Sequence, residues 1–216
     1  MNKRIAVLVS GGGTNLQALI DAQARGELGG GEIVAVISSK EGAYALERAA
    51  KVGIPGHVLP RKSFNSNQDM TLALVKLLKE RGIDLVVLAG CMIIFAKELT
   101  DAYPNAVINV HPALITSFCG QGFYGLRVHE AALRYGVKVS GATVHFVSEE
   151  CDGGPIIAQK AVAVLEDDTP ETLQRRIMEE AEWKLLPRAV KLFCEDRLTV
   201  DGRTVRIKGE ECMNVY

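Results

Sequence analysis

An asparagine and a histidine alternate at the end of a predicted strand, in the segment Asn109-Val110-His111-Pro112. Residues two apart on a strand face the same side of the sheet, so the two side chains project together. An amide that donates hydrogen bonds beside a titratable imidazole suits stabilisation of an oxyanion combined with proton transfer. An isolated Asn-x-His pair is more often structural, so the pattern alone leaves both interpretations open.

A carboxylate stands in the segment Asp152-Gly153-Gly154-Pro155, which is first of all a turn signal. From such a turn Asp152 could reach a histidine on a neighbouring strand, raise its pKa and fix its tautomer. His145 is an alternative partner, although its surroundings, Thr143 to Val147, are typical of a histidine packed in a sheet. Because no cysteines and histidines have the spacing of metal ligands, we predict no metal site.

A glycine-rich turn, Gly11-Gly12-Gly13, separates the first predicted strand from a helix that Thr14 and Asn15 are expected to cap. Such a turn exposes backbone N–H groups at a helix N-terminus, where an anion is favoured. A dinucleotide fingerprint would need a third glycine where Leu16 stands, and a P-loop would need a Lys-Ser/Thr pair after the glycines. The turn therefore predicts a single bound phosphate, with a tight turn without ligand as the alternative.

A second carboxylate, Glu182, falls on the apolar face of the longest predicted helix. At 100° per residue it shares that face with five apolar residues: Met178, Leu185, Leu186, Ala189 and Phe193. A carboxylate that faces the core needs a partner or a cationic ligand. An internal ion pair with an arginine and contact with an amine ligand are both compatible with this position.

These residues lie in a chain that alternates strands with helices, which indicates βαβ units, a mainly parallel sheet and right-handed crossovers. Strands are predicted over residues 5–9, 33–37, 57–59, 85–88, 107–110, 141–147 and 156–164. Helices are predicted over residues 16–25, 43–51, 68–81, 95–103 and 129–135, and from Pro170 onward with a kink at Pro187. A hairpin is expected around Asp201-Gly202. We expect one α/β domain over residues 1–195, with residues 196–216 as a C-terminal hairpin extension of the same domain.

Composition restricts the class of protein. The chain has 216 residues, and its 25 Lys and Arg against 26 Asp and Glu give a net charge of −1. This balance argues against nucleic-acid and anionic-membrane partners, which require clustered positive charge. The five cysteines (91, 119, 151, 194 and 212) include no C-x-x-C pair and read as reduced thiols. No stretch reaches the roughly 18 apolar residues of a membrane span. We therefore expect a soluble cytoplasmic protein.

Four ordered blocks between Ile5 and about Val190 resemble the folate-dependent phosphoribosylglycinamide formyltransferase family. They are Ser10-Gly11-Gly12-Gly13-Thr14-Asn15-Leu16-Gln17, Leu88-Ala89-Gly90-Cys91-Met92, Ile108-Asn109-Val110-His111-Pro112-Ala113-Leu114, and Gly141-Ala142-Thr143-Val144-His145-Phe146-Val147 leading to Asp152-Gly153-Gly154-Pro155. The resemblance implies a single Rossmann-like domain. It also implies transfer of the formyl group of 10-formyltetrahydrofolate, a co-substrate, to the glycinamide amine of phosphoribosylglycinamide in purine biosynthesis. Small-molecule substrates, no metal, and a monomer or homodimer are expected.

The same resemblance assigns roles to individual residues. His111 is expected to donate the proton, Asn109 to be a second donor to the oxyanion, and Asp152 to hold His111 protonated. The ribose phosphate would bind at Gly13, Thr14 and Asn15, and Glu182 would contact the glycinamide substrate. The folate would contact a further set of residues: Asn67, Met92, Ile93, Ile94, Phe95, Asn109 and Asp152.

Three positions depart from the family pattern. Ile93 and Asn67 stand where the family often has arginines that hold the glutamate tail of the folate. Ile115-Thr116 replaces a Leu-Pro pair, and the loop that follows, within residues 113–128, looks longer than usual. These departures leave tail binding and the loop conformation open, and none of them touches Asn109, His111 or Asp152.

Related classes remain as alternatives. Methionyl-tRNA formyltransferase carries an additional RNA-binding domain, for which 216 residues leave no room. Formyltetrahydrofolate hydrolase carries an N-terminal regulatory domain, whereas the first strand here is expected to begin near Arg4. A folate- or phosphate-binding module without catalysis is a third possibility, which a turnover assay with both substrates would separate.

Overall fold

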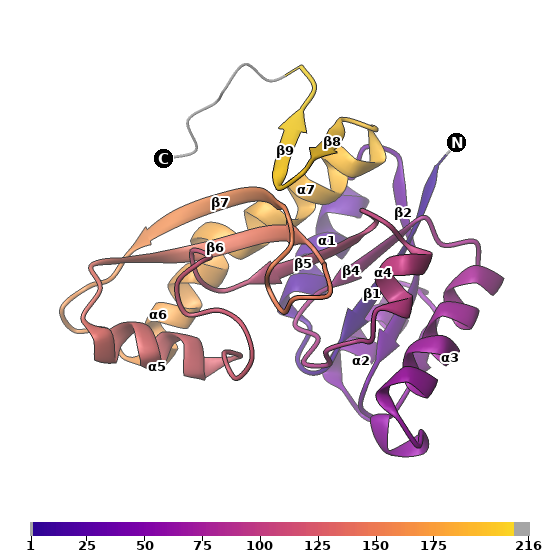
Figure 1. Ribbon diagram of the computed structural model, residues 1–216, viewed down its shortest axis with the longest axis horizontal. Helices are drawn as coiled ribbons and strands as arrows, with labels where there is room; N and C mark the ends of the chain where they lie inside the picture. Colours follow the sequence, from indigo (N-terminus) through magenta and orange to yellow (C-terminus); the bar gives the residue numbers. More distant parts are fainter. Residues whose placement is uncertain (1, 210–216) are drawn as a thin grey trace.

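A nine-stranded sheet forms the centre of the molecule in the computed structural model, which describes residues 2–209 (Figure 1). The strands are β1 (Lys3–Val9), β2 (Gly31–Ser38), β3 (Gly56–Val58), β4 (Leu85–Leu88), β5 (Val107–His111), β6 (Val139–Phe146), β7 (Ile156–Ala163), β8 (Leu198–Asp201) and β9 (Thr204–Ile207). The helices are α1 (Thr14–Ala24), α2 (Tyr44–Lys51), α3 (Asn67–Glu80), α4 (Glu98–Ala102), α5 (Leu126–Tyr135), α6 (Pro170–Ile177) and α7 (Trp183–Cys194). A 3₁₀ turn (Arg61–Ser63) and a π-helical turn (Met178–Glu182) complete the elements.

The sheet has a parallel half and an antiparallel half, in the order β3-β2-β1-β4-β5-β6-β7-β9-β8. The five strands from β3 to β5 are parallel, whereas β6 runs antiparallel to β5 and β7 antiparallel to β6. The prediction of a mainly parallel α/β sheet is confirmed. Because β1, β4 and β5 are parallel, their carboxyl ends meet at one edge, where α/β proteins bind ligands.

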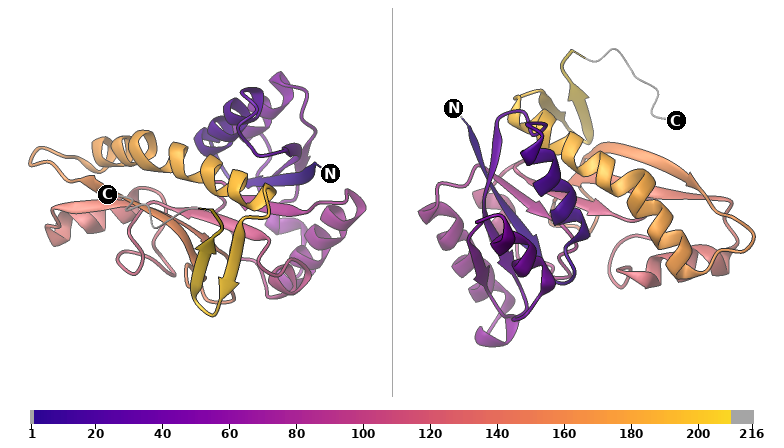
Figure 2. Two further views of the ribbon diagram at one scale, coloured as in Figure 1. Left: turned by 90° about the horizontal axis from the view of Figure 1, so that it is seen from above. Right: turned by 180° about the vertical axis from the view of Figure 1, so that it is seen from behind.

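Helices cover both faces of the sheet, which explains why the central strands are continuous apolar runs. In the view from behind, α1 and the long α6–α7 segment cross one face (Figure 2). Buried residues of these helices, such as Leu16, Leu19 and Leu186, belong to the same core as Val7 of β1. On the other face, Leu74 of α3 and Leu99 of α4 pack in a second core with residues of β1 and β4.

Each predicted strand is present, with ends that differ by at most two residues. The helix predicted over residues 95–103 is shorter, because only Glu98–Ala102 is helical. Side chains of α3 bind the preceding backbone instead: Asn67 Nδ2 donates to Ile94 O at 2.9 Å, and Ala96 N donates to Thr71 Oγ1 at 3.0 Å. These bonds hold residues 94–96 in a non-helical wall segment.

The long C-terminal helix is present, but it is not uniform. Its start is as predicted: Thr169 and Thr172 form a reciprocal capping box, and Pro170 occupies the first helical position. The irregularity lies at the π-helical turn, where Trp183 N donates to Met178 O five residues back. The predicted kink site, Pro187, lies one turn later, inside α7.

The predicted hairpin at Asp201-Gly202 is present as β8 and β9. Thr204 of β9 pairs with Ile156 of β7, so the hairpin joins the edge of the same sheet. Cys212 and the rest of the predicted extension beyond residue 209 lie outside the described residues, and the four described cysteines form no disulfide. No helix within residues 2–209 combines the length and the apolar character that crossing a membrane would require.

Candidate active site

Four polar side chains meet at the boundary between the parallel and antiparallel halves of the sheet. Asn109 and His111 come from β5, His145 from β6, and Asp152 from the turn between β6 and β7. Asp152 Oδ2 lies 3.4 Å from His111 Nδ1, and its Oδ1 lies 3.4 Å from Asn109 Nδ2 and 3.7 Å from His145 Nε2. We call these residues the polar cluster. The three residues assigned to catalysis from the sequence are thus brought together.

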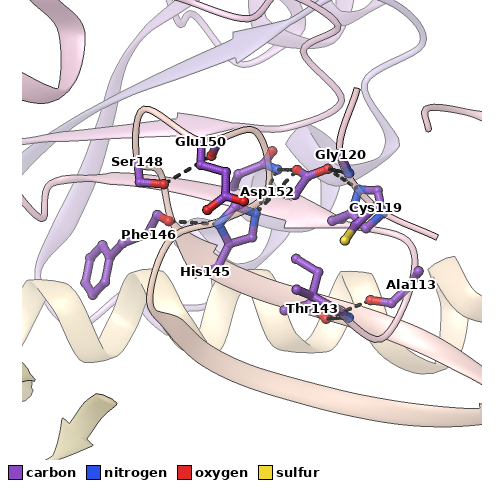
Figure 3. A network of polar contacts seen from close by, with 12 residues as sticks. Ala113, Cys119, Gly120, Thr143, His145, Phe146, Ser148, Glu150 and Asp152 are labelled. Carbon is purple, nitrogen blue, oxygen red and sulfur yellow. Dashed lines mark hydrogen bonds and ion pairs between the residues drawn. The ribbon is translucent and has the colours of Figure 1, made fainter. Parts of the chain in front are cut away.

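The backbone around Asp152 explains how a turn residue reaches the strand. Asp152 adopts a left-handed conformation with φ of 55°. A Cβ on Gly154 would stand 1.8 Å from the carbonyl oxygen of Phe146, so only glycine allows the turn to pack this closely on β6. Gly120 N donates to Asp152 Oδ2 at 2.9 Å from the facing loop (Figure 3). The turn and the loop together fix the carboxylate over β5.

His111 is buried, and both of its ring nitrogens face oxygen atoms. Nε2 lies 2.9 Å from the carbonyl oxygen of Phe118, which can only accept, so this nitrogen carries a proton. Burial lowers the pKa of His111; the Asp152 carboxylate and the Phe118 carbonyl oppose this effect without overcoming it. Asp152 thus favours the protonated form of His111, as expected from the sequence, but desolvation acts in the opposite direction and is the larger effect.

Asp152 itself is stabilised as a carboxylate. Burial alone would raise its pKa, but the His145 ring, the nearby His111 and the Gly120 N–H group more than compensate, and the pKa is lowered. A carboxylate with several donors around it keeps its charge even with a side chain only 9% exposed. Asp152 can therefore act as a fixed negative charge beside His111.

His145 belongs to this cluster, although its sequence context indicated a packed sheet histidine. It is 1% exposed, and its Nδ1 donates to its neighbour's carbonyl, Phe146 O, at 2.8 Å. Its Nε2 lies 3.2 Å from Asn109 Nδ2 and 3.7 Å from Asp152 Oδ1, between the amide and the carboxylate. The antiparallel register places His145 directly opposite Asn109. The sequence offered His145 as an alternative partner of Asp152, and the strand pairing places it beside both Asn109 and Asp152.

A cavity of about 510 Å³ opens beside the polar cluster. Its wall includes Met92, Ile93, Ile94 and Phe95, which the sequence assigned to folate contact. It also includes the four residues of the polar cluster. Asn67 is not part of this wall, because its side chain is bonded to Ile94 O. The size and mixed lining suit a drug-sized ligand with an apolar ring system.

The loop over this cavity, left open by the sequence, has a defined anchor at its start. The Thr143 hydroxyl donates to Ala113 O at 2.7 Å and accepts from Ile115 N at 3.1 Å. Farther along, the loop supplies the Phe118 carbonyl to His111 and the Gly120 N–H group to Asp152. The loop thus contributes directly to the polar cluster.

The glycine-rich turn lies at the carboxyl end of β1. The helix α1 begins at Thr14 and follows Gly13, which has a φ of 72°; no side chain caps it, so the predicted capping by Thr14 and Asn15 is wrong. A Cβ on Gly13 would stand 2.6 Å from Ala45 Cβ, which adds a packing reason for glycine there. The uncapped N–H groups of the first turn are available to an anion.

Asn15 and Glu182 form a buried pair that joins α1 to the π-helical turn. Asn15 Nδ2 donates to Glu182 Oε2 at 2.6 Å, and Glu182 is 5% exposed. Burial raises the pKa of Glu182 to about 7, although the Asn15 bond opposes the shift. Asn15 Oδ1 is buried without a partner, and within residues 2–209 no arginine pairs with Glu182. The internal ion pair is therefore not found, and the pair offers acceptor oxygens to a cation.

The two sites are connected through Ser10. Its hydroxyl accepts from Met92 N at 2.9 Å, and its own N–H group donates to Gly90 O at 3.2 Å. The glycine-rich turn and the wall of the large cavity are therefore held in one arrangement. Among the described residues no group of three or more His, Cys, Asp or Glu side chains is placed to hold a metal ion.

Comparisons with known proteins agree on one family. Residues 3–190 match the formyl transferase family. The chain is 38% identical over 208 residues to the phosphoribosylglycinamide formyltransferase of Haemophilus influenzae, an alignment that covers 96% of this chain and 95% of that protein. It is 40% identical over 197 residues to the chloroplastic enzyme of the same name from Arabidopsis thaliana, covering 91% and 67% of the two chains. The crystal structure of glycinamide ribonucleotide transformylase 1 from Symbiobacterium toebii superposes with a TM-score of 0.90 at 44% identity, covering 95% and 94%.

Proposed function

Because the chain belongs to the formyl transferase family, we propose that it is a phosphoribosylglycinamide formyltransferase. It transfers the formyl group of 10-formyltetrahydrofolate to the amine of phosphoribosylglycinamide, a step of purine biosynthesis. The observation that carries the proposal is the polar cluster in the wall of a 510 Å³ cavity, in a chain that aligns with nearly the full length of a relative with this name.

The two substrates occupy the two connected sites. The folate ring lies in the large cavity against Met92, Ile93, Ile94 and Phe95, with its formyl group at the polar cluster. The ribose phosphate binds at Gly13, Thr14 and Asn15 through the first turn of α1. Glu182, which accepts from Asn15 and has no cationic partner among the described residues, binds the glycinamide portion. The Ser10 link between the sites keeps the two substrates in register.

The reaction begins when the glycinamide nitrogen attacks the formyl carbon. The new C–N bond produces a tetrahedral oxyanion, to which His111 and Asn109 donate hydrogen bonds. The bond between this carbon and N10 of the folate then breaks, and the proton lost by the attacking nitrogen is transferred to N10. The products are formylated phosphoribosylglycinamide and tetrahydrofolate.

The geometry of His111 fits this role in one specific way. Its protonated Nε2 donates to Phe118 O in the free protein, so this donor turns from the loop carbonyl to the developing oxyanion. The negative charge of the oxyanion then favours the charged imidazolium that burial disfavours in the free protein. Asp152 stabilises the same imidazolium through Nδ1.

An assay for tetrahydrofolate release tests the proposal. The protein is incubated with 10-formyltetrahydrofolate, with and without phosphoribosylglycinamide. Release that requires phosphoribosylglycinamide, together with formylated product in the mass spectrum, is the expected result. Release of similar rate without the amine substrate would indicate a hydrolase and contradict the proposal.

Partners and location complete the proposal at a coarser level. Small-molecule substrates are consistent with the two sites, and the protein acts in the cytoplasm as a monomer or a homodimer. The absence of a metal from the reaction is part of the same proposal and is tested below by chelation.

A further inference from the structure

The backbone of the glycine-rich turn is held by the first two turns of α2. Ala45 N donates to Gly11 O at 3.2 Å, and Arg48 Nε donates to Gly12 O at 2.8 Å. Both carbonyl groups therefore point toward α2. A peptide that directs its carbonyl to one side directs its N–H group to the other, so α2 turns the N–H groups of this segment away from itself.

Arg48 has donor capacity beyond this contact. A guanidinium carries five N–H groups, and the structure gives Arg48 one further bond, from Nη1 to Gln17 Oε1 at 2.9 Å. The guanidinium also lies 4.9 Å from the centre of the Tyr44 ring. Within residues 2–209 no carboxylate forms an ion pair with Arg48, so its charge has no acidic partner there.

A cavity of about 280 Å³ lies beside Thr14 and is lined by Arg48, Gln17, Asp21, Arg25 and Trp183. The other arginine in this lining, Arg25, pairs with Glu27 at 2.7 Å. Asp21 accepts from Gln17 Nε2 at 2.8 Å, which aims Gln17 Oε1 at Arg48. Two buried polar atoms nearby, Asn15 Oδ1 and Trp183 Nε1, have no partner among the described residues. The lining is thus polar. Of its two arginines, Arg25 has an acidic partner and Arg48 has none among the described residues.

We propose that Arg48 is a further positioning residue for the substrate, which holds the glycine-rich turn in the conformation that presents its N–H groups to the substrate phosphate. The proposal rests on the proposed function, since it assigns Arg48 to the ribose phosphate of that substrate. Arginine suits this task because its planar donors contact the Gly12 carbonyl and Gln17 Oε1 at the same time.

The test compares two substrates in matched variants. Arg48→Met keeps the length of the side chain and removes its charge and donors, and Arg25→Met is the control from the same cavity. With phosphoribosylglycinamide, Arg48→Met is expected to lower kcat/KM by about 10–100-fold, mainly through the KM of this substrate, because the N–H groups that bind the phosphate are no longer held in place. With the dephosphorylated ribonucleoside, parent and variant should agree within about twofold, because the phosphate is absent. Arg25→Met should resemble the parent with both substrates.

A loss of equal size on the dephosphorylated substrate, or an equal rise in the KM for the folate, would overturn the proposal in favour of a purely structural role. If Arg48→Met does not fold, Arg48→Lys keeps a charge but not the paired donors. Its kcat/KM should fall by about threefold to tenfold on the phosphorylated substrate alone, and an equal loss on both substrates again overturns the proposal.

A parent protein that does not formylate phosphoribosylglycinamide contradicts the proposed function instead. Calorimetric binding of ribose 5-phosphate to parent and Arg48→Met then tests Arg48 separately: weaker binding to the variant supports the proposal, and equal binding overturns it.

Discussion

The polar cluster and the Asn15–Glu182 pair both contain a carboxylate withdrawn from water, yet the two pKa values move in opposite directions. Asp152 receives a backbone N–H group and faces Asn109 and two histidines, and its pKa is lowered. Glu182 has Asn15 as its donor, and its pKa rises to about 7. The number of donors, rather than burial alone, decides the charge. The protein itself stabilises the charge of the first carboxylate, whereas the second has no cationic partner among the described residues.

Asp152→Asn is the change expected to have the largest effect, because it removes the negative charge that the polar cluster stabilises. An amide cannot supply the negative charge that stabilises the imidazolium of His111, so kcat should fall by roughly 10²–10⁴. Steady-state kinetics measure the loss, and thermal unfolding checks that the fold is intact. Asp167→Asn, at an exposed position outside both sites, is the control. Turnover within about threefold of the parent would mean that Asp152 is only a turn residue.

Glu182→Gln tests the second region. Removing the charge should raise the KM for phosphoribosylglycinamide by about 10–100-fold, the scale of a hydrogen bond between charged groups. The KM for 10-formyltetrahydrofolate should not change, because we propose that this substrate occupies the cavity at the polar cluster. An equal rise in both KM values would place Glu182 in a structural role.

The same variant should show the cost of keeping a carboxylate in this position. The pKa of Glu182 is raised in the folded state from 4.5 to about 7, so the folded state holds the proton more tightly. The free energy of unfolding therefore decreases as pH rises from about 4.5 to 7. The total decrease from this group is about 3 kcal/mol above that range. Urea unfolding at pH 5 and pH 8 measures this effect. Glu182→Gln should gain stability relative to the parent at pH 8, and a difference that is independent of pH would argue against the buried ionisation.

Ile93→Arg is expected to have a smaller effect, because it adds a charge to the wall of the cavity without touching either carboxylate. An exposed pair with the glutamate tail contributes about 0.2–1 kcal/mol, so the KM for the folate should fall severalfold at low salt. The gain should shrink as salt is added, and the KM for phosphoribosylglycinamide should stay constant. An unchanged or higher KM for the folate would indicate that the tail is held elsewhere, at Lys97 or Arg127.

Chelation should have no effect at all. If Asn109, His111 and Asp152 stabilise the oxyanion by hydrogen bonds alone, turnover in EDTA should equal turnover without it. Loss of activity that zinc restores would contradict the comparison between the two carboxylates. A metal ion, rather than hydrogen-bond donors, would then stabilise the charge of Asp152.

Strands were predictable from the sequence because their burial on both faces leaves continuous apolar runs, as in residues 85–88. The length of the helix expected over residues 95–103 was overestimated because Asn67 and Thr71, distant in sequence, bind the backbone of Ile94 and Ala96. Local periodicity carries no information about such bonds.

The residues of the candidate site also fall into those that the sequence could predict and those that depend on tertiary contacts. Asn109 and His111 could be paired from strand geometry, and Asp152 from its turn and the family resemblance. The role of His145 depends on the register between β5 and β6, and the partner of Glu182 lies 167 residues away at Asn15. The net pKa of His111 depends on its burial, which the sequence does not give.

The π-helical turn at Met178–Glu182 has a consequence for insertions and deletions. A regular helix advances 100° per residue, so one residue removed from this turn would rotate Glu182 and α7 relative to α6. Either the apolar side of α7 would leave the sheet or the carboxylate would turn away from Asn15. Changes of residue type are therefore more tolerable here than changes of length, and we expect the spacing between Ile177 and Trp183 to be held constant even where the intervening residues vary.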